Sequence, residues 1–148
     1  NFALNPAYET TDMLFSVKAG IPKVADCDAF FLLPGDMPAV DAGTLAALAA
    51  ALANTAAAVA IPIMEGRRKH PPLIRACCRK DILSYDGEGG LRAIWRGYGD
   101  RVAEVPVDDR GCLLDADTMD DFFALSNYLQ HKQRSACTAP DLPEDMNG

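Results

Sequence analysis

The sequence predicts an α/β protein built on an open, mostly parallel β-sheet with helices on both faces. Short apolar runs alternate along the chain with helical patterns, which is the order expected of that class. One of these runs, residues 29–33, has no polar position, as expected of a strand covered on both faces. An Ala- and Leu-rich helical stretch follows it before the next apolar run.

Strands are expected where apolar runs are bounded by turn residues. The predicted strands are the end of a strand at 2–4, then 29–33, 57–63, 73–74 and 102–107. Residues 67–72, RRKHPP, are expected to form a loop, and the DGEGG stretch at 86–90 is expected to form a turn.

Helices are expected where apolar positions recur at helical spacing behind a capping residue. The predicted helices are 11–19, 42–53, 79–83, 91–97 and 119–130. Thr11 or Asp12 starts the first, Asp41 caps the second, which ends at Asn54, and Thr118 caps the last. Acidic residues in the first turn of the last helix favour the positive end of its dipole.

The size and net charge of the chain limit the classes of function that are expected. With 148 residues, of which 49% are hydrophobic, the chain can bury one core in one domain. A net charge of −7 argues against nucleic-acid binding, which needs Lys and Arg to neutralise phosphates. A small ligand, bridged by a metal to carboxylates, is the expected partner. The five cysteines are odd in number and include no C-x-x-C pair, so neither a disulfide framework nor a zinc site is expected, and a reducing cytoplasm fits.

No secretory signal or membrane span is expected. The chain opens NFALNP, without an initiator Met, and reads as an excised or processed piece. Residues 44–64 are long enough to raise the membrane question, but alanine dominates, Asn54-Thr55 interrupts them, and their second half is β-branched. A helix, a turn and a strand are expected there.

Asp36 is the first candidate functional residue. It follows the predicted strand at 29–33, where Pro34 and Gly35 turn the chain and Pro38 stiffens the exit. Ligands of open α/β sheets sit outside the carboxyl ends of the strands, and Mg²⁺ needs only one or two carboxylates from the protein. The alternative is an ordinary turn aspartate, and the loop alone does not decide between them.

A second group of carboxylates follows the predicted strand at 102–107. Asp115 and Asp117 lie just before a helix start, and two strand ends of one sheet can face the same crevice. Taken alone, Asp117 is better explained as a solvated residue before the Thr118 cap.

Four segments occur in an order that identifies a family. They are NPAYETTDMLFSVKAG, LLPGDMPAVDAGTL, RRKHPPLI and VAEVPVDDRGCLLDADTMDDF. Together they resemble the molybdenum-cofactor cytidylyltransferase family of MobA-like NTP transferases, over nearly all of residues 5–125. The resemblance implies a Rossmann-like open sheet of the nucleotidyltransferase type, and its specificity lies in the order and spacing of the segments.

The resemblance also implies a reaction. Members of that family transfer CMP from CTP to a terminal phosphate on molybdopterin, releasing pyrophosphate, with Mg²⁺ at the site. By motif position Asp36 and Asp117 match the catalytic, metal-binding residues, with Asp115 in reserve.

The family's acceptor contacts fall on four residues of this chain. His70 lies where the family has Gly-His-Pro, with Lys69 in place of the glycine, and Ser16 and Pro38 match further substrate-binding positions. Arg67 is read as part of a solvated basic loop. If the family's glycine needs a positive φ, Lys69 would be strained there.

Family members begin with a strand and a Gly-rich loop carrying Arg and Lys, which cradles the triphosphate. Residues 1–148 contain no such segment, so an N-terminally truncated version of the fold is expected, with activity of the isolated chain open. The expected organisation is a domain at 1–132 and an acidic tail or linker at 133–148, with a fused or partner domain possible beyond either end. Two other functions remain open: a non-catalytic binding or regulatory module that keeps the acceptor half, and a nucleotidyltransferase for a sugar phosphate or another small phosphate.

Overall fold

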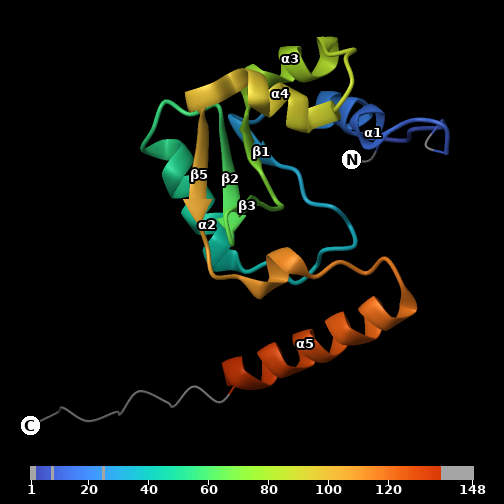
Figure 1. The fold of residues 1–148 in the computed structure, drawn as a ribbon, viewed down its shortest axis with the longest axis vertical. Helices are drawn as coiled ribbons and strands as arrows, with labels where there is room; N and C mark the ends of the chain where they lie inside the picture. Colours follow the sequence, from blue (N-terminus) through green and yellow to red (C-terminus); the bar gives the residue numbers. More distant parts are fainter. Residues whose placement is uncertain (1–2, 8, 25, 138–148) are drawn as a thin grey trace, which may run out of the picture.

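A central β-sheet with helices on both faces forms the body of the molecule in this computed structural model, which describes residues 3–7, 9–24 and 26–137 (Figure 1). The strands are β1 (Ala29–Phe31), β2 (Val59–Met64), β3 (Arg67–Arg68), β4 (Leu73–Arg75) and β5 (Val102–Pro106). The helices are α1 (Met13–Gly20), α2 (Ala42–Ala53), α3 (Arg79–Ser84), α4 (Gly90–Tyr98) and α5 (Met119–Cys137). The mixed α/β class is therefore confirmed.

The strand pairing differs from the expected mostly parallel one. Within the described residues β1 pairs with β4, and β2 pairs with β3 and β4, all antiparallel, while β2 and β5 pair in parallel from Val59↔Val102 to Ile63↔Pro106. Consequently β1, β2 and β5 run in one direction, and β4 is inserted in reverse between β1 and β2. The expectation was right for the direction of these three strands and wrong for most of the pairings.

A tight turn explains the reversed strand. Glu65 and Gly66 both have positive φ, 50° and 70°, which is the conformation of a two-residue hairpin turn. The chain therefore returns beside β2, and Arg67 and Arg68 form β3 where a loop was expected. The same returning segment continues into β4.

The two faces of the sheet bury two separate cores. On one face Val59, Ile61 and Ile74 pack with residues of α1, α3 and α4. On the other face Ala60 and Leu73 pack with α2 through Leu48 and Leu52. Alternate residues of β2 point to opposite faces, so both cores share this strand. Helices on both faces are thereby confirmed.

β1 is not the doubly buried strand that the apolar run predicted. It covers only the first part of 29–33 and, among the described residues, pairs with β4 alone. Phe31 is 38% exposed and Leu33 is 44% exposed. The reason is its position at the edge of the described sheet, where a side chain has fewer neighbours to cover it.

Most helix boundaries follow the capping residues. Asp12 Oδ1 accepts a hydrogen bond from Phe15 N at 3.3 Å, and α1 includes Gly20, one residue more than expected. At the start of α5, Thr118 N donates to Asp121 Oδ2 at 3.0 Å and Asp121 N donates to Thr118 Oγ1 at 3.2 Å, a reciprocal capping pair.

Two chain ends differ from expectation. α5 continues to Cys137, so the proposed boundary between 132 and 133 falls inside a helix, and 138–148 lie outside the described residues. The strand expected at 2–4 is wrong where it can be judged: Phe2 is outside the described residues, whereas Ala3 and Leu4 form no strand.

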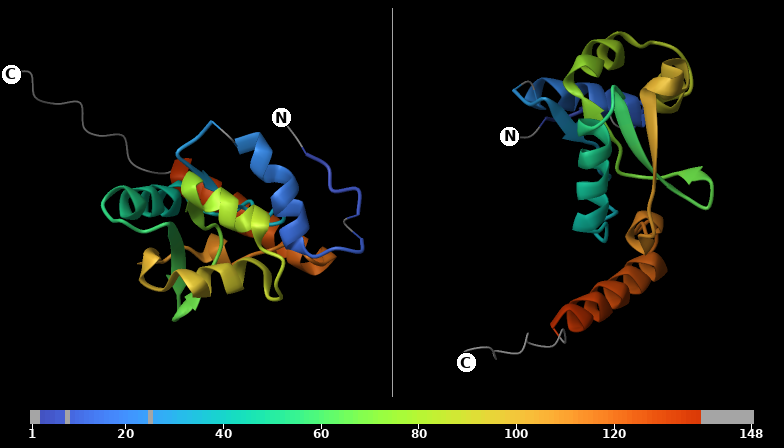
Figure 2. Two further views of the ribbon diagram at one scale, coloured as in Figure 1. Left: turned by 90° about the horizontal axis from the view of Figure 1, so that it is seen from above. Right: turned by 90° about the vertical axis from the view of Figure 1, so that its left-hand side faces the viewer.

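α5 lies beyond the carboxyl ends of β2 and β5, apart from the sheet (Figure 2). Lys132 holds it to the body by an ion pair with Asp41 and by donating a hydrogen bond to Ala39 O at 3.0 Å. No helix within the described ranges is long and apolar enough to cross a membrane, and residues 44–64 form α2, a turn and β2 as expected. The four cysteines with described side chains are free thiols.

Candidate functional site

The segments that carry the predicted site residues leave the same edge of the sheet. Because β1, β2 and β5 run in one direction, their carboxyl ends point the same way. Asp36 and Pro38 follow β1, Lys69 and His70 follow the hairpin at the end of β2, and Asp117 follows β5. This is the edge at which open α/β sheets bind ligands.

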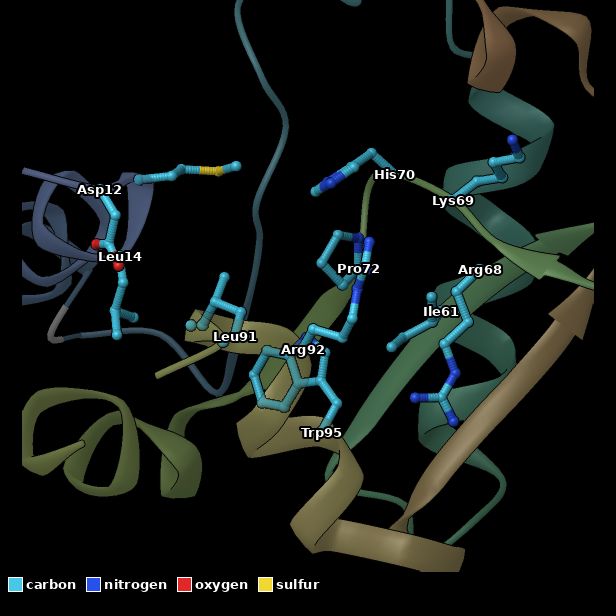
Figure 3. Close-up of a pocket in the computed structure, with 13 residues that line it drawn as sticks. Asp12, Leu14, Ile61, Arg68, Lys69, His70, Pro72, Leu91, Arg92 and Trp95 are labelled. Atoms are coloured by element: carbon cyan, nitrogen blue, oxygen red, sulfur yellow. The ribbon is translucent and has the colours of Figure 1, made fainter. Parts of the chain in front are cut away.

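A cavity of about 400 Å³ lies between the start of α1, the segment after β3 and the start of α4 (Figure 3). Its charged and titratable lining residues are Asp12, Arg68, Lys69, His70 and Arg92. Its large apolar lining residues are Met13, Leu14, Ile61, Pro72, Leu91 and Trp95. A surplus of basic groups over one acid, beside an apolar wall, suits an anionic ligand with an organic body.

His70 is the group in this cavity that the fold leaves least satisfied. In Figure 3 its ring points from the strand side toward α1, where Asp12 and Leu14 lie. Its Nδ1 atom is buried and has no hydrogen-bond partner among the described residues. Buried polar atoms in folded proteins nearly always have a partner, so an exception next to a cavity indicates a ligand contact.

Lys69 does not show the backbone strain that would follow if this position needed the positive φ of a glycine. Within the described residues, Glu65 alone among the residues other than glycine has a positive φ. The φ of Lys69 is therefore not positive. Its backbone N–H donates to Pro62 O at 2.8 Å, which ties it to the end of β2. The segment leading to His70 therefore keeps an ordinary backbone with lysine in place of glycine.

The arginines near the cavity differ in their partners. Arg68 Nε donates to Glu104 Oε1 at 2.8 Å, so much of its charge is offset. Arg92 forms no hydrogen bond or ion pair within the described ranges, and its charge is available to a ligand. Arg67 pairs in β3 and does not line the cavity, in keeping with its expected surface role.

Ser16 lies on α1 outside the cavity lining. Its hydroxyl accepts a hydrogen bond from Asn5 Nδ2 at 3.1 Å, and Asn5 also donates to Thr11 at 2.9 Å. The contact orients the start of the chain along α1. A role for Ser16 toward a substrate stays a prediction.

Asp36 is exposed on a loop that is anchored on both sides. Leu32 N donates to Pro72 O at 3.0 Å before it, and Met37 and Ala39 are buried after it, while Pro38 is exposed. Its carboxylate makes no hydrogen bond to the described residues, so its oxygens are available as ligands. The chain is therefore tied to the body on both sides of Asp36, and a metal-binding role for Asp36 stays a prediction.

Asp115 and Asp117 are also exposed, in the segment between the 3-10 turn Arg110–Leu113 and α5. Neither they nor Asp36 line the 400 Å³ cavity. Within the described ranges no three or more His, Cys, Asp or Glu residues come together as metal ligands. A magnesium site of two carboxylates needs fewer than that, because water and phosphate complete it, and so the pairing of Asp36 with Asp117 stays a prediction.

Asp109, a buried residue that positions loops of the candidate site, was not among the residues expected from the sequence. It is 2% exposed and accepts hydrogen bonds from Asp41 N at 2.8 Å, Thr44 Oγ1 at 2.7 Å and Gly111 N at 2.8 Å. Burial alone would raise the pKa of this carboxyl, but these hydrogen bonds outweigh it and hold the pKa below its ordinary value. The ionised carboxylate therefore ties the loop after β5 to the start of α2.

The turn around Asp109 is closely packed. A Cβ on Gly111 would lie 2.1 Å from Ala39 O, so only glycine fits there. Burial, and then the charge of Asp109, raise the pKa of Cys112 to about 12, which keeps its thiol as a donor to Asp109 at 3.5 Å. Because Ala39 ends the Asp36 loop, the turn joins both segments that carry the predicted metal ligands. The Asp-x-Gly spacing, typical of a side-chain-closed turn, was the available signal.

Comparisons with known proteins agree with this fold. The sequence model of the family described as "MobA-like NTP transferase domain" matches residues 1–104. The crystal structure of a Mycobacterium tuberculosis Rv0371c homolog from Mycobacterium sp. strain JC1 is similar, with a TM-score of 0.65 and 24% identity over 79% of this chain. The match spans 58% of that structure's chain, and at this identity the likeness concerns the fold. None of the curated proteins compared with the chain matches it.

Proposed function

The chain belongs to the MobA-like NTP transferase domain family, and we propose that it is part of a nucleotidyltransferase that moves CMP from CTP to phosphorylated molybdopterin. The observation that carries the proposal is the basic cavity between α1, α4 and the segment after β3, with His70 facing into it. A phosphorylated acceptor with an organic ring system matches both its charge and its apolar wall.

The proposed reaction is a substitution at the α-phosphate. An oxygen of the acceptor's terminal phosphate forms a bond to the α-phosphorus of CTP, the bond between that phosphorus and the bridging oxygen breaks, and pyrophosphate leaves with that oxygen. The product is a dinucleotide joined by a diphosphate. Such transfers need positioning and neutralisation of oxygen charge more than covalent help from the protein.

The oxygen ligands on the segments that leave the carboxyl edge of the sheet fit Mg²⁺. Asp36 and Asp117 offer exposed carboxylates, which are hard oxygen ligands, and Asp115 is a reserve. When bound, Mg²⁺ would neutralise charge on the triphosphate. The chain's own contribution is to hold these carboxylates on loops fixed by buried neighbours and by the Asp109 turn.

On the acceptor side, His70 and Lys69 are proposed to contact the substrate phosphate or its attached group. Ser16 and Pro38 are proposed as further contacts, although neither lines the cavity. The acceptor's position would then be set by the β2–β3 hairpin and α1, and that of the nucleotide by the loop after β1.

The test is CMP transfer by the full-length protein, measured with CTP labelled at the α-phosphate and by pyrophosphate release. Asp36→Asn should lower transfer at least about 100-fold, because a carboxylate that balances phosphate charge is lost, while the circular dichroism spectrum stays unchanged. Asp100→Asn is the matched control, since Asp100 is exposed and precedes β5, at the other edge of the sheet.

Transfer by Asp36→Asn at the wild-type rate would refute the role of Asp36. Transfer to a sugar phosphate in place of molybdopterin would change the acceptor and keep the reaction. Acceptor binding without any transfer would instead support a binding or regulatory module.

A further inference from the structure

We propose that Arg92 and the first turn of α4 form, with His70, a phosphate-binding subsite of the cavity. The nature of the ligand, a phosphate ester on the acceptor, rests on the proposed function. The subsite itself rests on the geometry of the cavity. Neither Arg92 nor the glycines before it are among the residues that the sequence pattern predicts to act, because the DGEGG stretch by itself indicates only a turn.

The charges around the cavity are unequally satisfied. Arg68 is paired with Glu104, and Asp12, the acid in the lining, caps α1 by accepting from Phe15 N. Arg92 has no such partner in the described part of the chain. The cavity therefore keeps an uncompensated guanidinium, and guanidinium groups bind phosphate through paired hydrogen bonds.

Arg92 and His70 approach the cavity from different walls. In Figure 3 the Arg92 side chain is directed from α4 toward the segment that carries His70 and Pro72. The His70 ring lies on that segment, and its Nδ1 is buried without a partner. Two nitrogen-bearing groups from separate elements, neither used by the fold, thus line one space.

The start of α4 adds backbone donors to these side chains. The helix has nine residues, its N-cap is Gly89, no side chain caps it, and no acid lies in its first turn. The first N–H groups of a helix have no partner within the helix, and its dipole favours an anion there. Ala93 N already donates to Gly89 O at 3.3 Å, so the free donors are those of Gly90, Leu91 and Arg92.

Glycine keeps this helix start open. Gly89 and Gly90 both have positive φ, 87° and 54°, and both line the cavity. A Cβ on Gly90 would meet nothing within 4 Å, whereas one on Gly89 would lie 3.2 Å from the Cβ of Ala93. Because glycine has no side chain, neither residue places side-chain atoms between the cavity and these N–H groups.

The apolar wall indicates that the phosphate belongs to a larger molecule. Ile61 and Trp95 are buried in the core between the sheet and helices α1, α3 and α4, and they also line the cavity. Leu91 packs against this core and lines the cavity as well. A free inorganic ion would leave this wall uncovered, whereas a phosphate ester with a flat organic group would cover it.

The test is titration of the full-length protein with inorganic phosphate, followed by the amide chemical shifts of Gly90 and Leu91. Wild type should show saturable shifts at these amides. Arg92→Gln should weaken phosphate binding about tenfold or more, as expected for the loss of a charge-assisted hydrogen bond. Arg96→Gln is the control, because it removes the same charge one turn further along α4, from a side chain outside the cavity lining.

Equal weakening by Arg92→Gln and Arg96→Gln, or the absence of shifts at these amides, would overturn the subsite. Failure of CMP transfer together with site-specific phosphate binding would refute the proposed function and keep the subsite. Conversely, transfer with an acceptor KM that Arg92→Gln leaves unchanged would refute the subsite and keep the function.

Discussion

Replacing the buried Asp109 by Asn tests whether its charge holds the two site loops together. The amide has nearly the same shape but only one accepting oxygen. In the wild type, Asp41 N and Thr44 Oγ1 both donate to Asp109 Oδ2, and Gly111 N donates to Oδ1. If the oxygen of the asparagine keeps the bond from Gly111 N, its NH₂ group faces these two donors. Thr44 can rotate and accept, whereas the backbone N–H of Asp41 cannot.

The cost follows from these three contacts. A buried N–H left without an acceptor costs about 1–3 kcal/mol, and the remaining hydrogen bonds lose the strength that the charge gave them. Together we expect Asp109→Asn to lower the free energy of unfolding by about 3 kcal/mol, or the melting temperature by about 10 °C. Urea unfolding at pH 7, followed by circular dichroism, measures it.

The pH dependence gives a second check. Because the pKa of Asp109 is lower in the folded protein than its ordinary value of 3.8, the carboxylate stabilises the fold fully above that value. Its contribution is lost as the pH falls through the folded-state pKa. The stability gap between wild type and Asp109→Asn should therefore stay constant from pH 7 to about pH 4 and shrink below it.

Asp108→Asn is the matched control, since Asp108 is the exposed neighbour. A loss below about 1 kcal/mol for Asp109→Asn, or a loss equal to that of the control, would refute the assignment of Asp109 as the residue that joins the loops.

The remaining predictions concern the cavity and the sheet. His70→Ala should raise the KM for the acceptor more than that for CTP in the transfer assay, because His70 faces the cavity, and equal changes would count against its placement. Leu33→Ala should cost less than about 1 kcal/mol, since Leu33 is 44% exposed, whereas Leu48→Ala should cost about 2–5 kcal/mol, since Leu48 is 0% exposed. Urea unfolding compares the two variants, and a larger loss for Leu33 would contradict its edge position.

Local chemistry made the helices predictable. Asp12 and the Thr118–Asp121 pair mark helix starts through hydrogen bonds that span a few residues, and Asn54 ends α2 where its sequence indicated. Such contacts join residues that are close together in the sequence, so the sequence pattern indicates them directly. The strands confirmed at β2, β4 and β5 are likewise local apolar runs.

Strand partners and burial were not predictable in the same way. An apolar run does not state which strand lies beside it, so neither the reversal of β4 nor the edge position of β1 followed from residues 29–33. Asp108 and Asp109 are adjacent and chemically identical in the sequence, and only the fold decides that Asp109 is the buried one. The hairpin at Glu65–Gly66 does carry a local turn signal, because glycine readily adopts the positive φ that such a turn needs.

The expected segments of the candidate site can be located in the structure, while the roles of their residues stay predictions. His70 and Lys69 do line one cavity, and the Asp36 loop does leave the same sheet edge. Arg92 lies 22 positions beyond His70 in the chain, so its presence in the cavity depends on how α4 packs on the sheet. No spacing rule in the sequence relates these two residues.

The unequal partnering of the strands sets which parts of the protein can open on their own. β2 is hydrogen-bonded to β3, β4 and β5, whereas β1 reaches the described sheet through β4 alone. Local opening favours segments with few partners, so β1 can detach while β2 and its neighbours stay paired. The loop with Asp36 follows β1, and the segment with His70 follows the hairpin at the end of β2. β1, which leads into the Asp36 loop, is therefore expected to open before β2, which leads into the segment with His70.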